Sequence, residues 1–214
     1  MVDKNVVRRS YDELGEAYLE DRSEEGLGTQ ILDEFLDSLS SPARVLDAGC
    51  GPGIPNLDRI SVASTAFGVD FSRGQLRLAA SNVPEAILVQ GDMSALPFET
   101  STLDAVVAYW SLIHVPIDEH QTVLNEFARI LRPRGELLLC EGTNAWTGEN
   151  PDWLDSGVKM EWNIAGAETT RQHLQTASFT ISRTWGAPSS LATNREDEDE
   201  NATPWTFFWA QRSI

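Results

Sequence analysis

Residues 44–53 read RVLDAGCGPG, and this stretch decides the fold. The apolar pair Val45 and Leu46 fits a strand that is buried on both faces of a parallel sheet. An acid follows at Asp47, and glycine then stands at every second position from Gly49. Glycine lets a chain turn tightly and lets a ligand approach the bare backbone. The stretch therefore predicts a site for a nucleoside-containing cofactor at the carboxyl end of a buried strand.

The rest of the chain alternates short apolar runs with amphipathic segments, which is typical of an α/β protein. Further strands are expected over residues 66–69, 86–90, 103–109, 136–141, 178–185 and 204–211. Helices are expected over residues 2–22, 29–39, 72–81, 118–131 and 167–176, with a short, poorly patterned one after Pro55. This pattern predicts a Rossmann-like, doubly wound fold with a seven-stranded, mostly parallel sheet. Helices cover both faces, and a C-terminal antiparallel hairpin completes the sheet.

A length of 214 residues fits one domain, residues 1–214, with a full core. Residues 1–40 are expected to place helices over the cofactor site. Residues 142–165 are polar and rich in tryptophan, which predicts a loop with at most one short helix on the acceptor side of the site. Residues 194–203 contain five consecutive acids, which predicts a solvated loop because like charges repel each other.

The strand ends carry the candidate ligand-binding side chains. Asp70 ends the second predicted strand, Asp92 follows the third, and Tyr109 ends the fourth. Because the carboxyl ends of parallel strands meet at one edge of the sheet, these side chains are expected to surround one crevice. A carboxylate at Asp70 can accept both hydroxyls of a ribose.

The cofactor follows from the glycine spacing and from a family resemblance. The dinucleotide pattern Gly-x-Gly-x-x-Gly would need a third glycine at residue 54, where isoleucine stands. The pattern of residues 45–53, together with the exits at Asp70, Asp92 and Tyr109, resembles the class I S-adenosylmethionine-dependent methyltransferases of the small, single-domain kind. A nicotinamide-dependent oxidoreductase and a non-catalytic S-adenosylmethionine-binding regulator stay open as alternatives.

The resemblance implies a role for each strand exit. Asp47 would help to hold the amino group of the cofactor, Asp70 the ribose, and Asp92 the adenine amino group. Aromatic faces after the fourth strand would flank the cationic sulfonium, and two N-terminal tyrosines would close over the methionine end. The residues expected to bind the cofactor are Tyr11, Tyr18, Asp47, Gly49, Cys50, Gly51, Asp70, Phe71, Asp92, Met93, Tyr109, Trp110 and Ser111.

The implied reaction is in-line transfer of a methyl group, for which proximity and orientation are the main requirements. A base helps only where the acceptor must lose a proton. His114 and Glu141 are the candidates, since they follow the fourth strand and end the fifth. For His114 the alternative is packing against the next helix. His120 and His173 are expected to be structural, and no Cys/His/Asp cluster has metal-ligand spacing.

The composition excludes some acceptors. A net charge of −17 and a pI of about 4.4 disfavour binding to nucleic-acid phosphates. Residues 109–112 read YWSL, where amino-directed methyltransferases of nucleic acids carry Asn/Asp-Pro-Pro-Tyr/Phe, and the chain has no Pro-Cys pair for attack on cytosine. A small-molecule acceptor is therefore expected, and the acceptor atom (O, N, S or C) is open.

The acidity has two interpretations. Acids are dispersed along the chain, and Lys4 and Lys159 are the two lysines among 16 basic residues. This pattern resembles halophile proteins, in which salt screens charge repulsion; a surface for a basic partner is the alternative. Salt adaptation predicts a melting temperature that rises from dilute buffer to molar KCl. A flat or falling melting temperature would contradict it.

The remaining signals concern location. The sequence contains no run of about 18 apolar residues, so no membrane-spanning helix is expected. The first residues lack the apolar core of a signal peptide. Cys50 and Cys140 are expected to be small buried residues in a reducing cytoplasm. A monomer or homodimer without membrane contact is expected.

Overall fold

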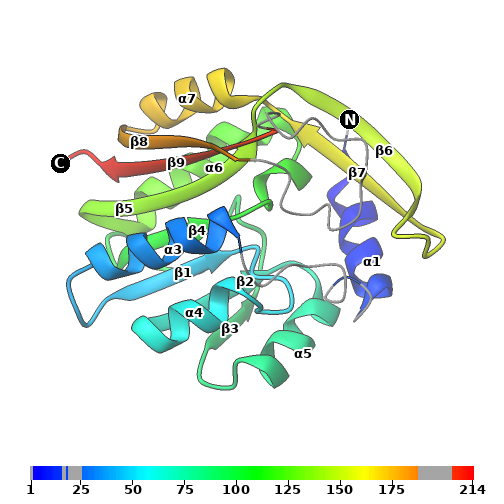
Figure 1. Cartoon of the computed structure of the whole chain (residues 1–214), viewed down its shortest axis with the longest axis horizontal. Helices are drawn as coiled ribbons and strands as arrows, with labels where there is room; N and C mark the ends of the chain where they lie inside the picture. The colour runs from blue at the N-terminus through cyan, green and yellow to red at the C-terminus, as the bar shows by residue number, and fades with distance from the viewer. Residues whose placement is uncertain (1, 16–17, 19–25, 188–203) are drawn as a thin grey trace.

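The computed structural model describes residues 2–15, 18, 26–187 and 204–214. Its larger sheet has seven strands in the order β3-β2-β1-β4-β5-β9-β8 (Figure 1). Pairing is parallel from β3 to β5, and β9 is antiparallel to both of its neighbours. The strands are β1 (Arg44–Ala48), β2 (Thr65–Asp70), β3 (Ile87–Gln90), β4 (Leu103–Ala108), β5 (Leu131–Gly142), β8 (Phe179–Ala187) and β9 (Trp205–Arg212). The predicted fold class is confirmed, including the antiparallel C-terminal hairpin.

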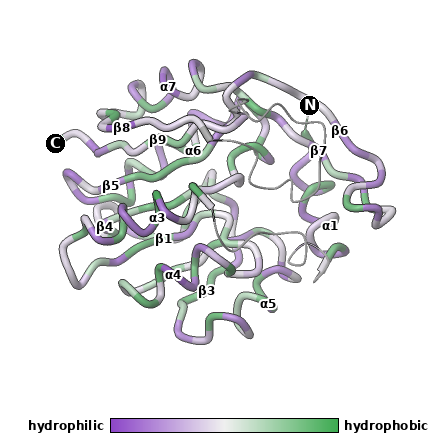
Figure 2. The backbone as a smooth tube through the Cα atoms, in the orientation of Figure 1, coloured by the Kyte–Doolittle hydropathy of each residue, from purple (hydrophilic) through white to green (hydrophobic). Residues whose placement is uncertain are grey.

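Alternate residues of the central strands enter two separate cores, because successive side chains of a strand point to opposite faces. Leu46 and Val106 pack with α6 (Ile117–Ile130) and α7 (Ala167–Thr176). Val45 and Val107 pack with the helices of the other face. Those helices are α3 (Leu27–Ser38), α4 (Asn56–Ala63) and α5 (Arg73–Asn82). The sheet is thus covered on both faces, and in Figure 2 the central strands are largely apolar.

The first helix is shorter than predicted. Helix α1 spans Lys4–Leu14, and the Asp3 side chain caps it by accepting from the Asn5 N–H at 2.8 Å. Gly15 ends it with a φ of 52°, a conformation that glycine adopts readily. The expected helix over residues 2–22 is therefore interrupted at Gly15, and Tyr18 is again helical. Residues 16–17 and 19–22 of that prediction lie outside the described residues, and so does the acidic loop at 194–203.

The segment predicted as a loop forms a second, two-stranded sheet instead. Strands β6 (Trp146–Trp153) and β7 (Val158–Ile164) pair antiparallel, with Trp146 opposite Ile164. The turn between them holds Leu154 and Asp155 at positive φ. Strand β6 is mostly exposed and polar, so its sequence lacks the alternation that would have indicated a strand. Pairing with β7 supplies its structure.

The β6–β7 hairpin and α1 lie together beyond the carboxyl ends of the parallel strands (Figure 1). They share an apolar cluster that is separate from the two sheet cores, in which Val7 and Leu14 of α1 meet Val158 and Met160 of β7. We call α1 and this hairpin the cap. Within the described part of the chain, no helix has both the length and the apolar character needed to span a bilayer.

Candidate cofactor and acceptor site

The glycine turn after β1 brings bare backbone to the edge of the sheet. The Gly49 N–H donates to the Val69 carbonyl at 2.7 Å, which ties the turn to β2. Gly49 and Gly51 have φ angles of 80° and 53°, where a side chain is strained. A Cβ on Gly49 would lie 2.3 Å from the Ser111 Cβ, whereas a Cβ on Gly51 would meet only Tyr18, at 3.8 Å. Gly49 is thus packed against protein, and Gly51 faces open space.

This contrast predicts different outcomes for two alanine substitutions. Gly49→Ala is expected to lower the free energy of unfolding by about 1–3 kcal/mol because Ser111 must move, in addition to the backbone strain at its positive φ. Gly51→Ala costs only the left-handed backbone strain of about 1–2 kcal/mol, but its methyl group enters the ligand space. Urea unfolding and calorimetry with S-adenosylhomocysteine separate the two effects. For each variant, the loss of affinity for S-adenosylhomocysteine is compared with the loss of unfolding free energy. The same ratio of these two losses in both variants would contradict this prediction.

Asp70 is buried at the end of β2 and organises the turn. Its Oδ2 accepts from the Gly51 N–H at 2.9 Å, and its Oδ1 accepts from the Ser72 N–H at 2.8 Å. Burial raises the pKa of the carboxyl to about 6, the two backbone hydrogen bonds oppose this, and the charge of Asp12 adds to it. Asp12 itself accepts from the Ser72 hydroxyl and the Gly74 N–H, each at 2.8 Å, and so ties α1 to α5.

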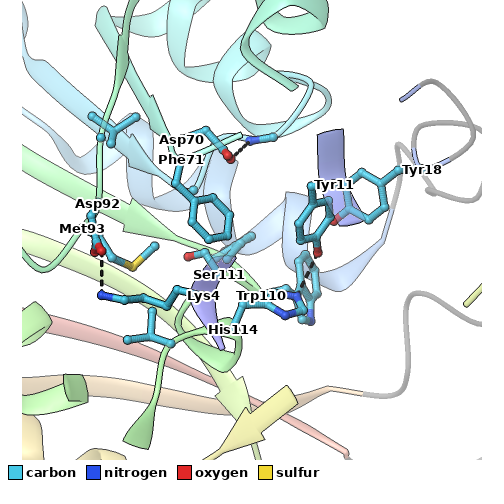
Figure 3. Close-up of a pocket in the computed structure, with 16 residues that line it drawn as sticks. Lys4, Tyr11, Tyr18, Asp70, Phe71, Asp92, Met93, Trp110, Ser111 and His114 are labelled. Carbon is cyan, nitrogen blue, oxygen red and sulfur yellow. Dashed lines mark hydrogen bonds and ion pairs between the residues drawn. The ribbon is translucent and has the colours of Figure 1, made fainter. Parts of the chain in front are cut away.

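Asp92 lies after β3 and is joined to the cap. Lys4 of α1 forms an ion pair with Asp92 at 2.6 Å (Figure 3). It forms a second ion pair with Glu119 at 2.5 Å. Ser94 donates its N–H and its hydroxyl to Asp92 Oδ1, each at 2.8 Å. Burial raises the pKa of Asp92, but the hydrogen bonds from Lys4 and Ser94 more than offset it, so the pKa lies below its usual value. Sequence reasoning missed Lys4, because its two partners are 88 and 115 positions away.

These elements surround an open cavity of about 640 Å³, solvent at its mouth included, that Lys4 also lines. Aromatic side chains from the cap and from the β2 and β4 exits point into it (Figure 3). Among the described residues, no group of three or more His, Cys, Asp or Glu side chains could hold a metal ion. The structure brings together these residues singled out from the sequence: Tyr11, Tyr18, Gly49, Gly51, Asp70, Phe71, Asp92, Met93, Tyr109, Trp110, Ser111 and His114.

Two residues expected at the cofactor, Asp47 and Cys50, do not line the cavity. Asp47 lies in β1 just before the turn, Cys50 lies within the turn, and both side chains are buried. Burial raises the pKa of the Cys50 thiol well above its usual value, and the charges of Asp70 and Asp47 add to this effect. The thiol packs in the apolar cluster with Leu57.

Glu141, a candidate base, is also outside the cavity lining. It is fully buried near the end of β5, where its Oε1 accepts from the Gly142 N–H at 2.9 Å. Its Oε2 has no hydrogen-bond partner in the part of the chain that the structure describes. Burial raises the pKa of this carboxyl to about 8. Glu141 is therefore a protonated interior group at neutral pH rather than a base facing the cavity.

His114, the other candidate base, does line the cavity. It ends η1 (Leu112–His114), a short 3-10 helix after β4, and is 6% exposed. Its Nε2 lies 2.8 Å from the Tyr11 hydroxyl, and its Nδ1 lies 3.0 Å from the Glu161 carbonyl of β7. The two other histidines, His120 and His173, lie in α6 and α7 and face each other there.

The tryptophans of the hairpin pack behind the tyrosines of α1. Trp153 contacts Tyr11 and Tyr18 with ring centroids 5.9 and 5.6 Å apart, and Trp162 contacts His114 at 6.1 Å. Trp153 and Trp162 belong to the apolar cluster of the cap. They therefore hold Tyr11, Tyr18 and His114 in place by packing.

Known proteins match the same core. The family model of a methyltransferase domain matches residues 46–139. Demethylmenaquinone methyltransferase of Streptomyces avermitilis is 33% identical over 98 residues, which are 46% of this chain and 42% of that protein. The chain spans less than half the length of the curated relatives it matches first.

Solved structures share the whole fold at low identity. Magnesium protoporphyrin IX methyltransferase of Synechocystis PCC 6803, solved with bound SAH, has a TM-score of 0.72 at 18% identity, covering 99% of this chain and 100% of that one. The [4+2]-cyclase SpnF has a TM-score of 0.69 at 20% identity, covering 97% and 96%. The second neighbour carries a name for a different reaction, so the fold alone does not fix the chemistry. Residues 46–139 thus match a methyltransferase domain, and the chain shares its overall fold with these solved structures.

Proposed function

We propose that this protein transfers a methyl group from S-adenosylmethionine to a small-molecule acceptor. The observation that carries the proposal is the convergence on one cavity of Gly51, Asp70 and Asp92 from successive strand exits, closed by the cap. The site offers bare backbone at Gly51, a buried carboxylate at Asp70 and a carboxylate at Asp92 that Lys4 holds. These groups suit a nucleoside with an amino-acid tail, which has an amino-acid part, a ribose and a base.

The residues of the cavity fit this cofactor. Each oxygen of Asp70 already accepts one backbone N–H. A carboxylate oxygen has two lone pairs, so Asp70 retains capacity for both ribose hydroxyls. The open space at Gly51 allows the ribose and methionine portion to approach the turn. Asp92 would accept from the adenine amino group while Lys4 fixes its orientation, and Met93 and Phe71 would cover the ring.

The methyl end would lie near Tyr109, Trp110 and Ser111. When bound, the cofactor supplies an activated methyl group on a cationic sulfonium. Trp110 would present an aromatic face to that charge. The Ser111 hydroxyl is buried without a hydrogen-bond partner among the described residues, so it can meet a ligand group. Tyr11 and Tyr18 would close this end from the cap and exclude water.

A flat, conjugated acceptor fits the aromatic lining of the cavity. The relatives named above act on demethylmenaquinone and on magnesium protoporphyrin IX, both conjugated small molecules. The same reasoning supports a small acceptor rather than a nucleic acid, since the protein is strongly acidic. We further propose a cytoplasmic monomer or homodimer, formed of one domain, in a salt-rich cell.

Calorimetry with S-adenosylmethionine, S-adenosylhomocysteine and NAD tests the cofactor. Binding of the first two, without NAD, supports the proposal, and binding of NAD alone overturns it in favour of an oxidoreductase. Labelled methyl donor with phenols, thiols, amines and quinols then tests the reaction. Cofactor binding without transfer to any of them would favour the regulator, or a reaction other than methyl transfer.

A further inference from the structure

A hydrogen bond between the cap and the β4 exit stands beside the acceptor end of the cavity. We propose that Tyr11 and His114 act together to remove the acceptor's proton, with the Tyr11 hydroxyl in contact with the acceptor and His114 acting through it. This inference rests on the proposed methyl transfer. It assigns the proton transfer to Tyr11 rather than to the histidine alone.

The partners of the imidazole fix its tautomer. The Glu161 carbonyl, 3.0 Å from Nδ1, can only accept, so Nδ1 carries a proton and donates it. Nε2 of the neutral ring is then an acceptor, and the Tyr11 hydroxyl at 2.8 Å donates to it. Both ring nitrogens are engaged. An acceptor in the cavity would therefore meet the tyrosine oxygen before it could meet the imidazole.

Packing holds the pair in this geometry. The Tyr11 ring makes edge-to-face contacts with Tyr18, His114 and Trp153, at centroid distances of 5.0, 5.3 and 5.9 Å. The Gln75 side chain donates to the Tyr11 carbonyl at 3.0 Å and anchors the backbone of α1. Figure 3 shows the Tyr11 hydroxyl directed toward His114, on the side of the cavity where Trp110 lies.

The proposed step balances in atoms and charge. As the acceptor atom bonds to the methyl carbon, the carbon–sulfur bond breaks and its electron pair returns to sulfur. The acceptor's proton passes to the Tyr11 oxygen, while the proton of Tyr11 passes to His114 Nε2. The positive charge of the sulfonium thus appears on the imidazolium, which then releases its proton to solvent.

The tautomer can be measured without any acceptor. His120 provides an internal contrast, because its Nε2 lies 3.0 Å from the Val115 carbonyl and must carry the proton there. Imidazole ¹⁵N NMR is expected to show His114 protonated on Nδ1 and His120 on Nε2. Tyr11→Phe is expected to move the His114 Nε2 resonance and leave His120 unchanged. A His114 protonated on Nε2, or one that is insensitive to Tyr11→Phe, overturns the proposal.

The activity arm uses Tyr11→Phe, which keeps the ring contacts and removes the hydroxyl. With the acceptor from the panel that the wild type methylates, kcat is expected to fall about 100-fold, the range of acid–base catalysis, while the Kd of S-adenosylhomocysteine stays within twofold. With acceptors that are already ionised in solution, the fall in kcat should be smaller. His120→Gln, a buried histidine outside the cavity lining, is the matched control and should retain kcat.

The outcomes separate a proton-transfer role from a structural one. Equal losses of kcat and of S-adenosylhomocysteine affinity in Tyr11→Phe would show that the pair only closes the cap and would overturn the relay. An unchanged kcat would also overturn it. If the wild type itself binds no S-adenosylhomocysteine and transfers no label, the proposed function fails, and the relay fails with it.

Discussion

Replacing Asp70 with alanine is expected to weaken the binding of S-adenosylhomocysteine by about 1.5–3 kcal/mol, or about 10–150-fold in Kd. The carboxyl is buried, and its two oxygens already hold the Gly51 and Ser72 N–H groups in place. The substitution removes the proposed acceptor for the ribose hydroxyls and leaves those two N–H groups without their partner. Isothermal calorimetry at pH 7.5 measures the change.

A pH series gives the same residue a second signature. Because the pKa of Asp70 is raised to about 6 by burial, with a further contribution from Asp12, the free protein takes up a proton there as the pH falls. A protonated carboxyl accepts fewer hydrogen bonds, so Kd at pH 5 is expected to be about tenfold weaker than at pH 7.5 in the wild type. In Asp70→Ala, this weakening of Kd between pH 7.5 and pH 5 should be absent.

The control is Asp118→Ala, which removes an exposed acid in the first turn of α6. It should bind S-adenosylhomocysteine like the wild type. Thermal unfolding of each variant checks that weaker binding does not reflect an unfolded fraction. A folded Asp70→Ala protein with wild-type affinity would remove Asp70 from the ligand site and would leave the cavity without its ribose-binding group.

The sequence predicted the sheet and most of the cavity lining because both depend on local signals. Strand β1 is an unbroken apolar run before glycines, and Asp70 ends a second such run. Parallel strands place these exits at one edge, so proximity in the fold follows from the topology alone. For the same reason Tyr109 and Trp110 were found without knowledge of any contact.

The parts that were missed depend on pairings between distant segments. Strand β6 contains Gly148, Asn150 and Pro151, which are poor strand formers, and it exists because β7 pairs with it. The bond of Tyr11 to His114 crosses 103 positions, and the Lys4–Asp92 ion pair crosses 88. The hydrophobic periodicity of a sequence does not indicate contacts between such distant residues. Glu141 was misplaced for a related reason, since an acid at a strand end can point into the interior as well as into the crevice.

Replacing Glu141 with glutamine is expected to stabilise the protein increasingly as the pH rises. The folded pKa is raised to about 8 by burial, above the ordinary value of 4.5. A raised folded pKa means that the contribution of this group to stability is complete below pH 4.5 and is lost as the pH rises to about 8. Glutamine keeps the shape, can accept from the Gly142 N–H, and does not titrate.

The measurable quantity is the difference in free energy of unfolding between Glu141→Gln and the wild type. From pH 6 to pH 9 the wild type loses about 3 kcal/mol through this one carboxyl, since two pKa units at 1.36 kcal/mol each separate pH 6 from the folded pKa. The pH dependence of Asp70 is common to both proteins and cancels, and burial together with the charge of Glu141 raises the pKa of the Cys140 thiol well above its usual value. Urea unfolding at pH 6, 7.5 and 9 measures the difference. Glu99→Gln, which removes a charge at an exposed position outside the helices and strands, controls for the change in net charge. A difference that stays constant from pH 6 to pH 9 would show that Glu141 is ionised in the folded protein, and would make it again a candidate for the base.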